Sequence, residues 1–260
     1  AHELALGVNY GRNQVDGAHF RNDGGRRNGL STRIDNDAET WEIFVLDRWQ
    51  MTDRWLLVLA GQAVFAERNT RSIETADGSV TSPSGDYSSF NPRVGFIFQA
   101  AEGVDVYANV SRVFEPPTHF ELEDDVRGDE QPLDAMAGTV AEVGIRGDRS
   151  LAKARYYFDV AAYYAAIEDE ILSREDPMAP GTSLATNADD TLHAGLEVSL
   201  GGEFGLGGQG HQLEPRLSLT LNHFRFDGDP DYGDNEMPAA PEYVLRGEVL
   251  YLHRLGFYGG

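Results

Sequence analysis

Residues 192–201 read Leu-His-Ala-Gly-Leu-Glu-Val-Ser-Leu-Gly, and this stretch alternates strictly along its length. One phase holds Leu192, Ala194, Leu196, Val198 and Leu200, and the other holds His193, Gly195, Glu197, Ser199 and Gly201. Successive side chains of a β-strand point to opposite faces, so a period of two predicts a strand with one apolar and one polar face.

The same alternation recurs along most of the chain. It is clear in residues 104–111, 139–146, 153–164, 192–201 and 216–222, and weaker in residues 4–10, 41–49, 55–65, 93–99 and 243–251. Helical periodicity is scarce. About ten strands and almost no helix predict an all-β, antiparallel structure.

The connections between these strands alternate between long and short. The short ones fall near residues 50–53, 100–103, 147–150, 201–211 and 253–256, and the long ones near residues 11–39, 67–89, 114–138, 168–190 and 227–242. In an up-and-down sheet this order places every long loop at one end, as in outer-membrane barrels. Five structureless loops of about 15 to 28 residues are unusual in a compact soluble domain. The pattern therefore favours a transmembrane β-barrel.

Composition narrows the function classes. The net charge of −22 argues against nucleic acid as a partner, because phosphate backbones are bound through Lys and Arg. The absence of cysteine excludes disulfides, thiol nucleophiles and Cys-ligated metals. The chain contains no run of 18 apolar residues, so the sequence does not predict a transmembrane helix. No serine-hydrolase or zinc-protease motif occurs, and the chain is not predicted to be an enzyme.

The residues between the apolar positions and at the strand ends also suit a membrane barrel. Trp49 and Trp55 flank one short turn, where an aromatic belt meets the lipid headgroups. Charged residues alternate with the apolar ones at Glu142, Arg146, Glu197, Arg246 and Glu248. Unpaired charges are costly in a packed core, so these positions predict a polar, water-filled interior.

Five further segments, taken in order, cover most of the chain. They are Ser-Phe-Asn-Pro-Arg-Val-Gly-Phe at 89–96, Val-Tyr-Ala-Asn-Val-Ser-Arg-Val-Phe-Glu-Pro-Pro at 106–117, Ala-Glu-Val-Gly-Ile-Arg-Gly at 141–147, Asn-Ala-Asp-Asp-Thr-Leu-His-Ala-Gly-Leu-Glu at 187–197 and Phe-Asp-Gly-Asp-Pro at 226–230. As an ordered set they resemble the β-barrel of TonB-dependent outer-membrane receptors of the iron–siderophore type.

The resemblance implies a 22-stranded barrel closed around a plug, a size at which the lumen needs plugging. We expect residues 1–260 to supply about ten or eleven of these strands, with the plug and the closing strands absent from the chain. The implied function is import of a ferric siderophore or other metal chelate, energised by the TonB complex through the plug. Outer-membrane lipid is the other expected partner, and no resident cofactor is implied.

His119 and Phe120, on the loop after Pro116 and Pro117, are candidate ligand contacts. Some haem receptors of the family carry an aromatic-Arg-Ala-Pro motif and a histidine on this loop, and His119 could ligate haem iron. However, Glu115 replaces the arginine, and the expected downstream Asn-Pro-Asn-Leu stretch is absent. This departure favours a solvated histidine on a loop stiffened by its prolines.

Lumen arginines are the second group of candidates. Acidic residues crowd two loops, one within residues 121–130 and one within residues 227–236, and neither fits a calcium loop of the EF-hand type. We expect these loops to be solvated, and their field favours neutral or cationic cargo. Anionic cargo would need counter-charge from Arg93, Arg146, Arg155 or Arg216. The metal carried is not predicted.

Two alternative functions stay open at this point. A passive, porin-like channel would share the barrel but lack the plug. A soluble β-domain that binds carbohydrate or protein would bury the apolar faces of its strands in a dry core.

Overall fold

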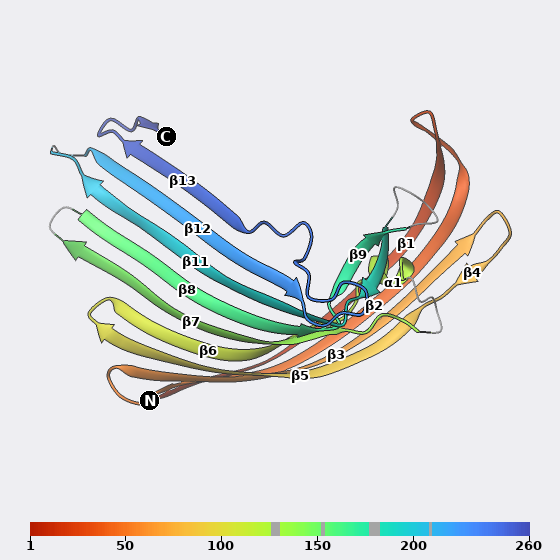
Figure 1. Cartoon of the computed structure of the whole chain (residues 1–260), viewed down its shortest axis with the longest axis horizontal. Helices are drawn as coiled ribbons and strands as arrows, with labels where there is room; N and C mark the ends of the chain where they lie inside the picture. The colour runs from red at the N-terminus through yellow and green to blue at the C-terminus, as the bar shows by residue number, and fades with distance from the viewer. Residues whose placement is uncertain (126–130, 152–153, 177–182, 208–209) are drawn as a thin grey trace.

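The computed structural model describes residues 1–125, 131–151, 154–176, 183–207 and 210–260. These residues form one antiparallel sheet in the order β1-β2-β3-β5-β6-β7-β8-β11-β12-β13-β14, with β4 paired to β3 and a separate hairpin of β9 and β10. The strands are β1 (His2–Asp23), β2 (Arg26–Gln50), β3 (Trp55–Glu74), β4 (Val80–Thr81), β5 (Ser84–Ala101), β6 (Val104–Glu115), β7 (Met136–Leu151), β8 (Ala154–Glu168), β9 (Ile171–Glu175), β10 (Ser183–Asn187), β11 (Asp190–Gly205), β12 (Gln212–Phe226), β13 (Tyr243–Leu252) and β14 (Tyr258–Gly259). Among the described residues the sheet is a curved trough that does not close on itself (Figure 1).

The register joins the apolar phases of neighbouring strands into one continuous face. Leu196 of β11 is paired with Ala162 of β8 and with Leu221 of β12. The next residue, Glu197, is paired with Ala161 and Thr220 on the other face. Directly paired residues of an antiparallel sheet share a face, so the two-sided character predicted for single strands extends across the sheet.

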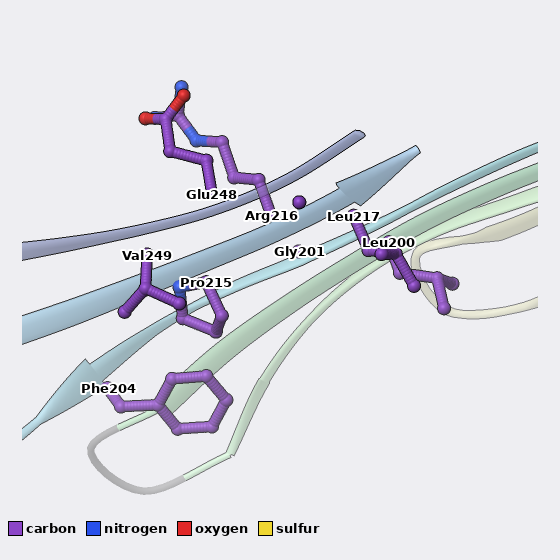
Figure 2. Close-up of a pocket in the computed structure, with 9 residues that line it drawn as sticks. Leu200, Gly201, Phe204, Pro215, Arg216, Leu217, Glu248 and Val249 are labelled. Atoms are coloured by element: carbon purple, nitrogen blue, oxygen red, sulfur yellow. The ribbon is translucent and has the colours of Figure 1, made fainter. Parts of the chain in front are cut away.

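The apolar face is exposed. Leu6, Phe90 and Val143 keep 72%, 63% and 53% of their surface accessible. Figure 2 shows the division near the short-turn end, where Arg216 and Glu248 point to one side of the sheet and the labelled apolar side chains point to the other. A soluble domain would bury this apolar face, so the soluble alternative is wrong.

The first two long connections are not loops, contrary to the prediction. β1 and β2 pair from His2 and Trp49 to a tight turn at Gly24 and Gly25, with shifts of register on either side of Phe20. β3 likewise continues to Glu74. The alternation is lost there because both faces of these outer hairpins carry polar residues, while backbone pairing continues regardless of side-chain type. The predicted turn at 147–150 is also wrong, since those residues belong to β7.

The third and fourth long connections contain structure that folds onto the polar face. The helix α1 (His119–Glu123) begins with a capping box in which Thr118 and Glu121 bond each other's backbone N–H groups. Leu122 of α1, Leu133, Ala185 of β10 and Ile171 of β9 form a small apolar cluster. Figure 1 shows α1 and β9 inside the trough, near the long-connection end. No helix in the described part of the chain is long and apolar enough to cross a membrane.

Tyrosine rings lie flat against the polar face over glycines of the neighbouring strand. A Cβ built at Gly144 would lie 2.4 Å from the ring of Tyr107, and one at Gly195 would lie 2.5 Å from that of Tyr163. In each pair the glycine and the tyrosine are direct register partners. The missing side chain therefore makes room for the neighbouring ring, which keeps this part of the wall shallow.

Candidate functional site

A hollow of about 200 Å³ on the polar face is the candidate site. It lies at the middle of the sheet, on β5, β6 and β7. Its lining includes Arg93, Tyr107, Asn109, Glu142 and Arg146. The structure thus brings together two of the predicted contacts, Arg93 and Arg146, from strands that are not adjacent to each other.

Most polar groups of this hollow have partners. The Arg146 Nε atom is 3.7 Å from Asp105 Oδ2, and its guanidinium carbon lies 5.5 Å from the centre of the Tyr107 ring. The Tyr107 hydroxyl donates to Asp159 Oδ1 at 3.3 Å. Arg146 is therefore positioned before any ligand arrives, beside a carboxylate that offsets part of its charge.

Arg93 differs from Arg146. Its side chain is exposed, and no ion pair or hydrogen bond joins it to another described residue. It shares the hollow with Glu142, whose Oε1 accepts a long hydrogen bond of 3.4 Å from Asn109 Nδ2. The guanidinium of Arg93 therefore has unused hydrogen-bond donors in this hollow, and such donors suit an oxygen-rich ligand.

Arg155 lies elsewhere. It is the second residue of β8, next to the short-turn end, where it pairs with Asp148 through its Nε and Nη2 atoms and with Glu203 at 3.5 Å. Arg216 similarly pairs with Glu214 at 3.2 Å. These two arginines have carboxylate partners, and neither lines the hollow of Arg93.

His119 and Phe120 lie on α1, at the other end of the trough from Arg155. Phe120 keeps 69% of its surface exposed. Both ring nitrogens of His119 are buried and have no hydrogen-bond partner. Burial and the nearby Arg68 lower the pKa of His119, so the ring is neutral at neutral pH, although Glu123 and Asp37 oppose this shift.

The enclosure of His119 bears on the haem hypothesis. Neither nitrogen faces solvent, so ligation of haem iron would require α1 to move away from the wall. Within the described ranges no three metal-binding side chains come together.

Hydrogen bonds hold both ends of α1 against β2 and β3. The Arg68 Nε atom of β3 donates to the Pro117 carbonyl at 3.2 Å, just before the helix. Asn36 of β2 donates from Nδ2 to Glu123 Oε1 at 2.8 Å. The helix is thus fixed to the wall by two side chains.

A second tie fixes the hairpin of β9 and β10 to β11. Glu170 accepts hydrogen bonds from the Thr191 hydroxyl and from His193 Nε2, the latter at 3.0 Å. The His193 ring stacks on Phe224, with ring centres 4.3 Å apart. Burial opposes ionisation of Glu170, but the two hydrogen bonds outweigh it and lower the pKa of this carboxyl.

The acidic loops are partly structural rather than solvated. Asp229 keeps only 7% of its surface exposed, and its carboxylate accepts from the backbone N–H groups of Asp231, Tyr232 and Asp189. Burial opposes ionisation of Asp229, but these donors outweigh it and lower its pKa. In the first loop Glu121 and Glu123 cap and anchor α1, while Asp129 and Glu130 lie outside the described residues.

Sequence reasoning did not single out Tyr107, Asn109 or Glu170 as site residues. Tyr107 and Asn109 lie on the polar phase of β6, and that signal was present in the alternation. Glu170 had no such signal, because its partners on β11 are more than 20 residues away and are fixed only by the folded loop.

Comparison with known proteins gives a consistent result. All of residues 1–260 match the family model described as "TonB dependent receptor-like, beta-barrel". A search of curated proteins found no match. Among solved structures, the ferric-catecholate import receptor Fiu from K12 E. coli is similar, with 18% identity, a TM-score of 0.68, and coverage of 97% of this chain and 39% of that one.

Two further solved structures have similar scores. The copper transporter OprC has 16% identity and a TM-score of 0.71, with 97% of this chain and 39% of OprC covered. The siderophore receptor PiuA from Acinetobacter baumannii has 15% identity and a TM-score of 0.68, with 98% and 41% covered. The chain therefore spans about two fifths of the length of these proteins.

Proposed function

Since the chain belongs to the TonB-dependent receptor β-barrel family and lies in the bacterial outer membrane, we propose that it takes part in active import of a ferric siderophore or similar iron chelate. The chain contributes the wall of the barrel and the inward-folded segments of its long-connection end. Energy comes from TonB acting on a plug domain, as in the family.

The observation that supports this proposal is the hollow on the polar face. Arg93 has unused donors there, while Arg146, Tyr107 and Asn109 are held by neighbouring side chains. Such a hollow offers a positioned set of donors and acceptors for the oxygen atoms of a chelate.

The charges favour a neutral or cationic chelate. Arg146, Arg155 and Arg216 each have a carboxylate within 3.7 Å, so of the four candidate arginines Arg93 alone is left as counter-charge for an anion. The chain as a whole has a net charge of −22. An anionic complex would be repelled on approach, at least at low ionic strength.

Growth on defined iron sources tests this proposal. A strain lacking the gene for the full-length receptor is grown under iron limitation with a neutral ferric trihydroxamate or a trianionic ferric tricatecholate. The receptor gene is restored in cells with and without a working TonB. We expect growth on the neutral chelate to require both the receptor and TonB.

Two results would contradict the proposal in different ways. Growth that needs the receptor but not TonB would favour the passive, porin-like channel, and liposome swelling with the full-length receptor would then be fast. Growth restored only by the trianionic chelate would refute the charge argument and leave active import standing.

A further inference from the structure

A groove of about 470 Å³ lies on the apolar, lipid-facing side of the sheet, across β5, β6, β7 and β8. Its floor includes the small side chains of Ala108, Ala141 and Ala162. Larger side chains, such as Phe96 and Tyr164, rise around them. In the register Ala108 is paired with Phe96, and Ala141 with Tyr164, so small and large residues lie side by side across the strands.

One cation lies beside this groove on the same face. Arg112 follows Val110 of the groove by two residues on β6, so both side chains point to the lipid side. Arg112 is exposed and forms no ion pair with any residue that the structure describes. Its register partner Thr139 is uncharged.

Arg225 provides the contrast. It lies on the same lipid-facing phase, on β12, where it is paired with Leu192. Unlike Arg112, it has two carboxylates of its own, Asp227 at 3.4 Å and Asp234 at 3.8 Å.

An unpaired charge on the lipid face is unfavourable, by about 2–4 kcal/mol at the bilayer midplane and less towards the interfaces. A long arginine side chain reduces this cost by reaching the headgroup layer. Arg112 lies at the end of β6 that leads into a long connection, so it can reach the headgroups of the outer leaflet. A guanidinium there matches a phosphate in charge and in hydrogen-bond geometry.

We propose that the groove and Arg112 together bind one phosphate-bearing lipid of the outer leaflet. An acyl chain lies over the alanines of the groove, and the headgroup phosphate accepts hydrogen bonds from the Arg112 guanidinium. This site is independent of the cargo, because it lies on the opposite face of the sheet from Arg93.

Native mass spectrometry of the full-length receptor in a neutral detergent tests the site. The probes are phosphatidylglycerol and a neutral glucosyl diacylglycerol with the same acyl chains. The variants are Arg112→Gln, Arg112→Lys, Ala141→Leu and the control Arg225→Gln. Each variant is first checked for folding by its altered migration in electrophoresis with and without heating.

We expect the wild type and Arg225→Gln to bind phosphatidylglycerol about fivefold more tightly than the neutral lipid. This affinity ratio corresponds to the attraction of about 1 kcal/mol between one basic side chain and an anionic headgroup. Arg112→Gln should lose this preference and Arg112→Lys should keep most of it. Ala141→Leu fills the groove and should weaken binding of both lipids. An unchanged preference in Arg112→Gln would refute the headgroup contact, and unchanged binding in Ala141→Leu would refute the groove.

Discussion

Replacing Gly103 by alanine should destabilise the barrel far more than the same change at Gly78. Both glycines are in turns with positive φ, +66° at Gly103 and +77° at Gly78. A Cβ at Gly78 would meet nothing within 4 Å, whereas one at Gly103 would lie 2.4 Å from the backbone oxygen of Asp148. The two variants share the backbone strain and differ in the clash.

The structure sets the size of the difference. Alanine in the left-handed region costs about 1–2 kcal/mol, which applies to both variants. At Gly103 the clash cannot be relieved by rotating a side chain. The turn must separate from β7, where the Asp148 N–H donates to the Gly103 carbonyl at 2.9 Å and Arg149 donates to the Glu102 carbonyl at 3.0 Å. Losing these two bonds adds about 1–3 kcal/mol.

Urea unfolding of the full-length receptor in phospholipid vesicles measures both variants. We expect the free energy of unfolding to fall by about 1–2 kcal/mol in Gly78→Ala and by about 2–5 kcal/mol in Gly103→Ala. Equal losses in the two variants would show that the contact between this turn and β7 contributes nothing, and would refute the reasoning.

Three further variants test the ties and the hollow. Arg93→Gln should weaken binding of an oxygen-rich ferric chelate about fivefold or more, which corresponds to a loss of about 1 kcal/mol of binding free energy. Arg155→Gln should leave chelate binding unchanged, because Arg155 is already paired with carboxylates. Binding of the radiolabelled ferric chelate measures both variants. Glu170→Gln should raise hydrogen exchange in β9 roughly tenfold at neutral pH. In the wild type, the hydrogen bond between Glu170 and His193 is fully formed above the ordinary carboxyl pKa of about 4.3. It is lost as the pH falls through the pKa of folded Glu170, which is lower than the ordinary value. After correction for the intrinsic pH dependence of exchange, hydrogen exchange in β9 should therefore rise only at this lower pH. Asp229→Ala leaves three backbone N–H groups without their acceptor and should increase proteolysis of its loop at neutral pH, with no change in the urea midpoint of the barrel.

The alternation of side chains was enough to predict the sheet. Residues 192–201 form the middle of β11, with Leu196 on the apolar face and Glu197 on the polar face as predicted. Alternation fails where both faces carry polar residues, even though one face of β2 is buried there at Thr32, Ile34 and Asn36. The hairpin of β1 and β2 continues about a dozen residues beyond its apolar part, where backbone pairing is supported by polar contacts such as the 2.8 Å ion pair of Arg12 and Asp37.

The site was less predictable than the fold. The phase of each strand placed Arg93, Arg146 and Arg155 on the polar face, but phase does not say which of them are neighbours. That depends on the register between strands, which brought Arg146 to the hollow of Arg93 and left Arg155 near the short turns. The prediction of a solvated histidine on a loop was wrong for His119, which begins α1 and has both ring nitrogens buried, because this helix has only five residues and no periodic signal.

The inward segments form one continuous connection across the trough. Asn36 of β2 holds Glu123 at the end of α1, and the Ala185 N–H of β10 donates to the Asp124 carbonyl at 2.7 Å. At the far side Glu170 holds His193 of β11. The Arg68 Nε atom also holds the Pro117 carbonyl, and the Tyr87 hydroxyl of β5 donates to the Leu133 carbonyl at 2.9 Å. Because β2 and β11 are separated by five strands in the sheet, breaking one of these bonds leaves the segments attached to the wall elsewhere. A chelate entering from the long-connection end must therefore pass beside these segments or release several bonds together, at a cost of about 0.5–3 kcal/mol for each.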